Sequence, residues 1–430
     1  MPFLPFLTNP IRQATLPRGA FLPASLPQRS LSLVDAMTTI SPSLTVHQFQ
    51  HVGELRAAAG AWDDLWNRAE SAAPLTRAEL LAQWLDEFAP KATCRCLIVE
   101  EGGQFVAALP LVGRRVKRLF EMASIPSNPW CVCGDLLVDP QADVPAALDA
   151  LVDAINRLPW PLVWLTPVPL ATPRWQAFSA ALTRAEMPFA VQSHYHIGEI
   201  NLDGDWESYQ AGWSGKHRRQ MHKALDRARH DGPLELKVYD HLAGDQLNQA
   251  LRRGFAVENR SWKGQAGTSV LRTPGMFELY QRQARQLAEW GQLRLAFLEH
   301  AGREIAFEYG FRAKRTYFSA KVGYDPAFAD YSPGQLLRLL LLERFHEDGE
   351  IDRVDFWGPL SRATSEWIDS VYAVGRIVAA PRRMAGRLAL RAYRVLQALG
   401  RPWRRLSAPG QTARIPEAGD VNQRLNAPRR

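Results

Sequence analysis

The segment YDPAFADYSPGQLL, residues 324–337, joins a stretch rich in aromatic and β-branched residues to a strongly apolar stretch. The pattern predicts a strand over residues 316–323 and a helix over residues 334–347. Ser332 is the expected N-cap of this helix, Pro333 suits its first position, and Gln335 completes a capping box. Gly334 lets another group approach the backbone closely. Such a helix start is either a phosphate site or simply a capped helix.

Strands and helices alternate on both sides of this segment. Helices are expected over residues 53–70, 76–88, 144–157, 174–184, 244–259 and 276–290, and strands over residues 94–99, 104–112, 162–165, 189–200, 293–299, 304–312 and 353–357. Helices interleaved with a hairpin-rich sheet predict a mixed α/β architecture.

The two halves of the chain resemble each other. The hairpin sequence VEEGGQFVAAL at residues 99–109 matches LEHAGREIAFE at residues 298–308 in kind, 199 residues later. The order of the expected elements is also similar, which predicts a duplicated domain. We expect domains over residues 44–200 and 201–374. A disordered extension over residues 1–43 would precede them, and an Arg-rich helix with a disordered tail over residues 375–430 would follow.

A basic helix is expected between Trp213 and Gly232, where the two halves meet. Its apolar stripe is made by His217, Met221, Ala224, Leu225 and Ala228, and its cations are Lys216, Arg218, Arg219, Lys223, Arg227 and Arg229. The cationic side is either a solvated face or a face turned to an anion. We expect a domain connector with Arg218 and Arg219 directed to a substrate.

The net charge of +8 is unevenly distributed. Residues 375–430 contain 13 Arg and no Lys against Glu417 and Asp420, a net charge of +11, which leaves −3 for residues 1–374. The nearly neutral body argues against a general nucleic-acid surface.

The tail contains an amphipathic segment, residues 381–400. An apolar face made by Met384, Leu388, Ala392, Leu396 and Leu399 lies beside Arg383, Arg387, Arg391 and Arg394. This composition fits either an anionic membrane surface or a helix docked on the body. The chain contains no apolar run of the ~18 residues that a bilayer span requires.

The four cysteines are too few for a disulfide framework and favour a reduced, cytoplasmic setting. Cys94/Cys96 and Cys131/Cys133 form two C-x-C pairs, which could hold zinc or be small buried hydrophobes. We predict no metal site. The sequence has no P-loop, no G-x-G-x-x-G after a strand, no H-E-x-x-H and no nucleophile elbow, so covalent catalysis and metal-dependent hydrolysis are poorly supported.

Several motifs in a fixed order carry a family resemblance. The basic helix is followed by S-W-K-G at 261–264, a hairpin ending in I-A-F at 305–307, the G-Y-D and Y-S-P-G motifs of residues 323–334, and a D-F strand at 355–356. This order resembles the double-domain GNAT acyltransferases over residues 44–374, most strongly from Trp206 to Gly358. The branch it most resembles is the cellulose-biosynthesis-associated acetyltransferases, which are related to Fem-type peptidyltransferases.

The resemblance implies a fold of two GNAT-like mixed-sheet domains and acetyl-CoA, or another acyl-CoA, as co-substrate. The acyl-CoA would lie beside the splayed strand 316–323. The implied pyrophosphate site is Tyr331, Ser332, Pro333, Gly334, Gln335 and Leu336. Two features depart from the family: only one glycine lies in this loop, and no Tyr-Lys pair follows Asp355-Phe-Trp-Gly.

The implied chemistry is direct transfer of the acyl group to an amine. It requires a base for the ammonium group and a backbone N–H on the splayed strand for the oxyanion. The candidate bases are Asp355, Glu308 and Glu258, and Tyr324 is the candidate acid for the thiolate. Trp262 and Lys263 are expected to line the acceptor site together with Glu258.

The acceptor stays open among sugar amines, amino acids, polyamines and proteins. Two other classes of function also remain: a non-catalytic accessory protein of surface-polysaccharide production, and tRNA-dependent aminoacyl transfer of the Fem type. We expect a cytoplasmic protein that contacts the inner membrane surface peripherally through its Arg-rich helix.

Overall fold

A computed structural model describes residues 43–116 and 120–403. The extension predicted over residues 1–43 lies outside this range except for residue 43, as does the tail from residue 404. The first half contains β1 (Thr45–Phe49), α1 (Val52–Ala57), α2 (Ala59–Arg68), η1 (Pro74–Thr76), α3 (Ala78–Phe88), β2 (Cys94–Glu101), β3 (Gln104–Val116), β4 (Phe120–Ser124), β5 (Leu137–Val138), α4 (Val144–Arg157), β6 (Val163–Pro169) and α5 (Pro173–Arg184).

The second half follows a long connecting strand, β7 (Phe189–Asn201). Its elements are α6 (Trp206–Ala211), α7 (Gly215–Asp231), β8 (Leu234–Tyr239), α8 (Gly244–Arg260), α9 (Trp262–Gln265), α10 (Met276–Glu289), β9 (Leu293–His300), β10 (Arg303–Ala313), β11 (Thr316–Tyr324), η2 (Pro326–Tyr331), α11 (Pro333–Asp348), β12 (Arg353–Pro359), β13 (Ser370–Ala379) and α12 (Met384–Trp403). The mixed α/β fold predicted from the sequence is confirmed.

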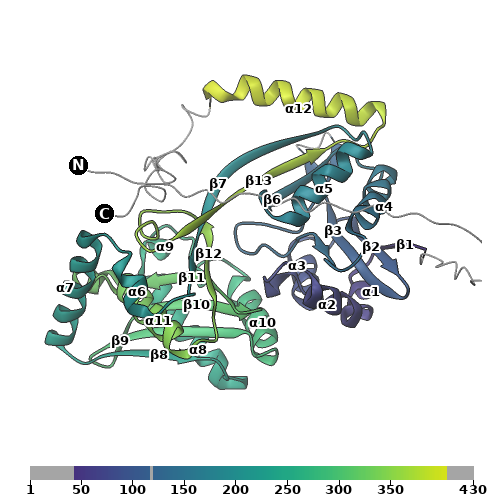
Figure 1. Ribbon diagram of the computed structural model, residues 1–430. Helices are drawn as coiled ribbons and strands as arrows, with labels where there is room; N and C mark the ends of the chain where they lie inside the picture. Colours follow the sequence, from purple (N-terminus) through teal and green to yellow (C-terminus); the bar gives the residue numbers. More distant parts are fainter. Residues whose placement is uncertain (1–42, 117–119, 404–430) are drawn as a thin grey trace, which may run out of the picture. The chain divides into compact units, whose positions relative to one another are not determined.

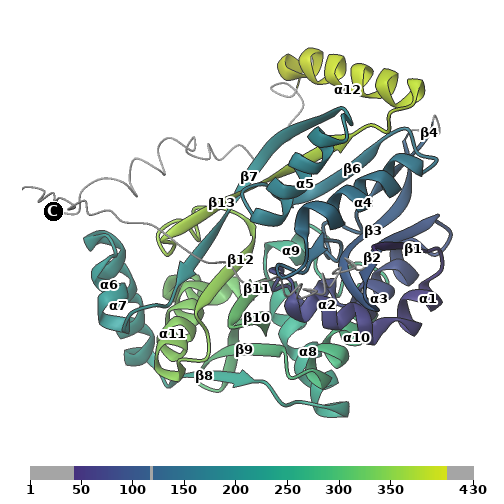
Figure 2. The same cartoon turned by 45° about the vertical axis from the view of Figure 1, so that its right-hand side comes forward.

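One sheet runs through both halves, in the order β1-β2-β3-β4-β6-β13-β7-β12-β11-β10-β9-β8 (Figure 1). At its centre the halves exchange strands. β7 leaves the first half and pairs with β12, whereas β13 returns from the second half and pairs with β6. β7 and β13 also pair with each other and run side by side in both views (Figure 2). Backbone hydrogen bonds therefore join the halves, and the sequence predicts neither β13 nor this exchange.

The same strand arrangement occurs twice. In the first half β4 and β6 are parallel and pair only at Ala123↔Val163 and Ser124↔Trp164. In the second half β11 and β12 are parallel and pair over three positions, Thr316↔Arg353 to Phe318↔Asp355. A helix connects each parallel pair, α4 in the first half and α11 in the second, as a parallel connection requires. Each half thus contains a sheet built from hairpins, and at its end two parallel strands pair briefly and then diverge.

Separate helices cover the two faces of the second-half sheet. One core cluster joins residues of α2, α3, α8 and α10 to one face, and another joins α7 and α11 to the opposite face. The stripe of α7 is buried at His217, Met221, Ala224 and Ala228, while Leu225 is only partly buried. The cations of α7 are exposed. The predicted buried stripe is therefore confirmed in the main.

Candidate active site

β11 separates from β12 at an irregularity in its pairing with β10. The register changes between Tyr309↔Lys321 and Gly310↔Ser319, so Ala320 is an extra residue in β11. A β-bulge of this kind bends its strand and increases the local twist. Pairing with β12 ends at Phe318, and within residues 43–116 and 120–403 no strand pairs with the rest of β11 on that side. The bulge therefore opens an edge of the sheet between β11 and β12.

The backbone of Val322 faces this open edge. The N–H of Asp325 donates to the carbonyl of Ile305 at 2.8 Å, and Val322 is the register partner of Glu308. Because backbone groups alternate in direction along an antiparallel ladder, those of Val322 point away from β10. The Nζ of Lys263 lies 2.9 Å from the Val322 carbonyl oxygen, which agrees with this direction. Val322 thus supplies an N–H of the kind expected from the sequence for an oxyanion.

Glu258 and Lys263 meet beside Val322. Glu258 is 1% exposed, and its Oε1 lies 3.2 Å from the Nζ of Lys263. Its Oε2 accepts a hydrogen bond from the N–H of Val270 at 3.0 Å. The approach of α8 to β11 is tight: a β-carbon on Gly323 would lie 2.5 Å from the Glu258 Cα. The structure therefore brings together two of the acceptor-site residues predicted from the S-W-K-G region.

A third ionisable residue, Lys321, belongs to the same edge. Because it is paired with Tyr309, it projects to the sheet face covered by α8 and α10. Its Nζ lies 4.7 Å from the ring centroid of Trp130 and 5.6 Å from that of Tyr280. Burial, followed by the neighbouring Lys263 ammonium, lowers the pKa of Lys321 from 10.5 to about 8.

The sequence does not single out Lys321. Its only local signal is a lysine inside the otherwise uncharged strand TYFSAKVG. Trp130 comes from the first half of the chain, and the Tyr280 hydroxyl donates to its carbonyl at 2.8 Å. These partners depend on the packing of the two halves, which the sequence does not predict.

Asp355 lies where the parallel pairing ends. Its Oδ1 accepts from the N–H of Trp357 at 2.6 Å and its Oδ2 from the hydroxyl of Tyr372 at 2.8 Å. Burial raises the pKa of Asp355 to about 7. Its register partner is Phe318, and a strand advances about 3.3 Å per residue. Val322 follows Phe318 by four residues along β11, so it lies well away from Asp355. Proton transfer across this separation would have to pass through water.

Glu308 projects to the opposite face of the sheet from Lys321, since it alternates with Phe307 and Tyr309 along β10. The Tyr317 hydroxyl donates to its Oε1 at 2.8 Å. Burial raises the pKa of Glu308, and the charge of Arg338 opposes this shift. The structure therefore does not group Glu308 with Glu258, Lys263 and Lys321.

The start of α11 differs from the predicted capping box. Ser332 is at the N-cap position with φ of 54°, and its side chain makes no cap hydrogen bond. The Gln335 side chain does not cap either: its Oε1 accepts from the indole of Trp367 at 2.6 Å, and its Nε2 donates to the Ala363 carbonyl. The loop after β12 recruits Gln335, so the predicted capping box is wrong.

The other residues of this helix start divide into buried and accessible groups. Pro333 is buried, and Leu336 is buried in the core at 0% exposure. A β-carbon on Gly334 would meet only a ring carbon of Tyr324, at 3.7 Å, and Tyr324 is 38% exposed. The Tyr331 hydroxyl donates to Asp231 of α7 at 2.8 Å. Gly334 therefore leaves open space at an uncapped helix start.

Trp262 is 57% exposed, and Arg218 and Arg219 are exposed on α7. Their assignment to the acceptor site stays a prediction. The four cysteines are buried in pairs, with Sγ–Sγ distances of 3.8 Å for Cys94/Cys96 and 3.0 Å for Cys131/Cys133. Within residues 43–116 and 120–403, no three His, Cys, Asp or Glu side chains are placed to hold a metal ion.

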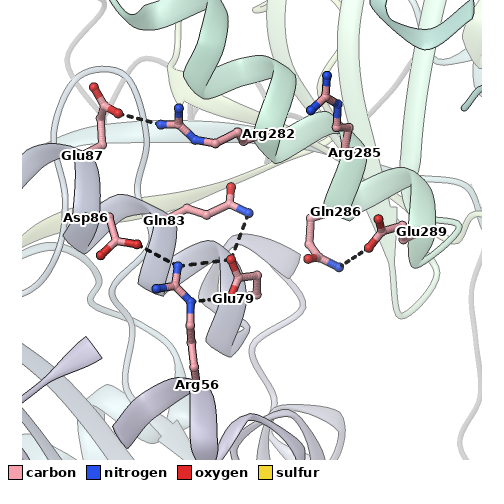
Figure 3. Close-up of a pocket in the computed structure, with 9 residues that line it drawn as sticks. All are labelled: Arg56, Glu79, Gln83, Asp86, Glu87, Arg282, Arg285, Gln286 and Glu289. Atoms are coloured by element: carbon pink, nitrogen blue, oxygen red, sulfur yellow. Dashed lines mark hydrogen bonds and ion pairs between the residues drawn. The ribbon is translucent and has the colours of Figure 1, made fainter. Parts of the chain in front are cut away.

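A pocket of about 460 Å³ lies elsewhere, between the first-half helices α1 and α3 and the second-half helix α10 (Figure 3). Ion pairs occupy its walls: Arg56 with Glu79 at 2.9 Å and with Asp86 at 2.7 Å, and Arg282 with Glu87 at 2.6 Å. None of the residues predicted for the site lines it. Because the charged side chains in its walls are already largely paired with one another, we assign no catalytic or binding role to this pocket.

Residues 215–366 match the family model described as an acetyltransferase (GNAT) domain. This segment is similar to GNAT acetyltransferase domains. It spans α7 to the loop after β12 and includes the bulged strand, Glu258, Lys263 and Lys321. The match confirms the GNAT part of the predicted resemblance and supports membership in an acyltransferase family. It does not show the cellulose-associated branch.

The fold of the longer chain is similar to that of one solved structure, and two further structures align with lower scores. The crystal structure of FemX aligns with a TM-score of 0.54 at 10% identity, over 77% of this chain and 96% of that chain. A tandem GNAT protein from the clavulanic acid biosynthesis pathway aligns at 14% identity and a TM-score of 0.40, over 78% and 98% of the two chains. The C-terminal domain of a putative lysylphosphatidylglycerol synthetase from Agrobacterium fabrum aligns at 13% identity and a TM-score of 0.48, over 80% and 97%. The comparison with curated proteins finds no match.

Proposed function

We propose that this protein is an acyl-CoA-dependent N-acyltransferase whose active site is the open edge of β11. One observation carries the proposal: the bulge at Ala320 frees the backbone of Val322 beside the buried carboxylate of Glu258. An N–H directed at a developing oxyanion and a nearby carboxylate base are the two groups that acyl transfer to an amine requires.

Residues of this chain fit an acyl-CoA. The start of α11 offers the backbone N–H of Gly334 and the positive end of the helix dipole to phosphate oxygens, whereas the Ser332 N–H already donates to the Ala329 carbonyl and Pro333 has no N–H. The open space beside Gly334 leaves room for such a group. When bound, the acyl-CoA supplies a thioester carbonyl whose carbon is attacked by the amine.

The residues at the edge then have separate tasks. Val322 N–H stabilises the negative charge that develops on the carbonyl oxygen, and Glu258 takes the proton from the attacking ammonium. The N–C bond forms as the C–S bond breaks, and the thiolate takes a proton from Tyr324 beside the start of α11. Among the three candidate bases, Glu258 is favoured because Glu308 faces the other side of the sheet and Asp355 is more distant along it.

The proposal extends to the identity of the acyl group and to the branch of the family. The resemblance to cellulose-associated acetyltransferases favours acetyl-CoA as donor and an amine of cell-surface polysaccharide metabolism as acceptor. An aminoacyl-tRNA donor of the Fem type is the second candidate, supported by the exposed cations of α7. Co-purifying tRNA that is released steeply with salt would favour that donor instead.

Calorimetry with acetyl-CoA tests the proposal, and Gly334→Leu probes the helix start. We expect saturable binding to the wild-type chain and an affinity at least about tenfold lower in the variant, equivalent to ~1.4 kcal/mol. Gly60→Leu is a matched control, because Gly60 is also the second residue of a helix and faces open space. Absence of acyl-CoA binding to the wild-type chain would remove the proposal, and equal affinities in all three proteins would remove the assigned phosphate site.

A further inference from the structure

The open edge of β11 has one positive charge more than its neighbours balance. Glu258 is paired with Lys263 and also accepts the Val270 N–H, whereas Lys321 has no ion pair among the described residues. The Lys321 ammonium lies instead against the rings of Trp130 and Tyr280. A partly buried cation without an anionic partner is unfavourable, and a bound anion would remove this disadvantage.

We propose that Lys321 binds an acid group of the substrate, so that the enzyme recognises an amine or an acyl chain bearing a carboxylate or phosphate. This inference rests on the proposed function, because it places the acid beside the reacting carbonyl. Lys321 directly precedes Val322, whose N–H we assign to the oxyanion. The acid therefore lies only a few bonds from the reacting atoms, as in a short amino acid or in a dicarboxylic acyl thioester.

The two sources of the acid are distinguished by matched probes in calorimetry. For the acyl chain, propionyl-CoA is compared with succinyl-CoA, which adds one carboxylate. For the acceptor, ethylamine is compared with β-alanine in the presence of CoA. Each pair is titrated into the wild-type chain, into Lys321→Met and into the charge-preserving variant Lys321→Arg.

We expect the acid-bearing probe of one pair to bind about 10–100-fold more tightly than its neutral partner, as for a hydrogen bond to a charged group. Lys321→Met abolishes this advantage and Lys321→Arg retains most of it. Above a pH of about 8 the advantage declines as the Lys321 amine loses its proton. If neither acid binds better than its neutral partner, or if Lys321→Met keeps the advantage, the inference is overturned. Undiminished binding of propionyl-CoA in that case leaves the proposed function standing.

A second surface is presented by α12, which lies along the first half (Figure 1). One side of the helix packs through Leu390 against Met122, Leu162 and Val378. The other side exposes four large apolar side chains, with Met384 72%, Leu388 56%, Val395 56% and Leu396 68% exposed. In the described part of the chain, no helix has the length and apolar character to cross a bilayer.

The charged residues in and next to α12 are all basic. Arg387, Arg391 and Arg394 lie on α12, Arg383 directly precedes it, and no acidic residue occurs between residues 381 and 416. The guanidinium groups of Arg383 and Arg394 donate to backbone carbonyls of Arg157 and Phe189. Arg387 and Arg391 are exposed. Cations beside exposed apolar residues are the features of a helix that lies in an anionic bilayer surface.

We infer that α12 docks the protein on an anionic membrane surface. The test is flotation of the full chain with vesicles of phosphatidylcholine alone and of phosphatidylcholine mixed with phosphatidylglycerol. The variants are Leu388→Ser/Leu396→Ser for the apolar face and Arg387→Gln/Arg391→Gln for the charge. Arg229→Gln/Arg272→Gln, which removes two exposed arginines outside α12, is the matched control.

We expect the wild-type chain and the control to float with phosphatidylglycerol vesicles and not with phosphatidylcholine alone. Both α12 variants are expected to reduce the bound fraction at least about tenfold, because exposed apolar side chains and arginines both contribute to binding at such a surface. Failure of the wild-type chain to float, or flotation unaffected by the α12 variants, would overturn the inference. So would a dimer in solution that Leu388→Ser/Leu396→Ser dissociates, since a second copy would then be the partner of this face.

Discussion

Replacing Glu258 with Gln is expected to lower kcat/KM for acyl transfer by about 10²–10⁴-fold, the usual contribution of a general base. Gln keeps the shape of the side chain but cannot take the ammonium proton. Acyl-CoA affinity should be retained, because the assigned phosphate site is at the start of α11. Steady-state release of CoA, measured beside calorimetry with acetyl-CoA, separates the two quantities.

The substitution also affects folding, and a second variant separates this effect from catalysis. Glu258 and Lys263 form a partly buried pair, and removal of one member of a buried pair costs about 3–5 kcal/mol. The double variant Glu258→Gln/Lys263→Met removes both charges and should recover much of the free energy of unfolding without recovering activity. Recovery of activity along with stability would show that Glu258 has only a structural role.

Asp355→Asn is the comparison for the base assigned from the sequence. If Asp355 rather than Glu258 were the proton acceptor, Asp355→Asn would lose acyl-transfer activity and Glu258→Gln would keep it. Because the folded pKa of Asp355 is raised from 3.8 to about 7, its carboxyl contributes stability below pH 4 that is lost as the pH rises to 7. Asn cannot titrate, so urea unfolding between pH 4 and 7 should show a weaker pH dependence in the variant.

Local sequence signals predict part of this site. The S-W-K-G motif places Lys263 near the end of a helix containing Glu258, and the structure brings both residues to β11. These residues are close in sequence, so short-range geometry determines their relation. The sequence also predicts the start of α11 correctly, but not its capping, because Trp367 and Ala363 from a later loop bind Gln335.

The features missed from the sequence depend on contacts between distant segments. Lys321 acquires its environment from Trp130, 191 positions earlier in the sequence. The exchange of β7 and β13 needs a register between strands that no local pattern specifies. Asp355 is the first candidate base from the sequence, ahead of Glu258, yet the point at which β11 and β12 part separates it from Val322. Residues that are close in sequence can thus be grouped from local signals, whereas contacts between distant segments cannot be predicted in this way.

The tightest of these contacts gives the largest effect expected on stability. Gly323 of β11 lies under α8, and a β-carbon there would be 2.5 Å from the Cα and 3.1 Å from the backbone nitrogen of Glu258. Backbone atoms of a buried helix cannot move aside as a flexible side chain can. Gly323→Val should therefore displace α8 from the sheet and cost more than the about 1–3 kcal/mol typical of overpacking. It should also move Glu258 away from Val322 and abolish acyl transfer.

Gly334→Val is the matched control, since a β-carbon at Gly334 approaches no heavy atom closer than 3.7 Å. We expect thermal unfolding of this variant close to that of the wild-type chain, with weaker acetyl-CoA binding, whereas Gly323→Val is strongly destabilised or insoluble. The milder Gly323→Ala keeps the test informative if the valine variant does not fold, and should lose both stability and activity. A Gly323→Ala protein with wild-type unfolding and wild-type turnover would show that the contact between α8 and β11 does not position the base.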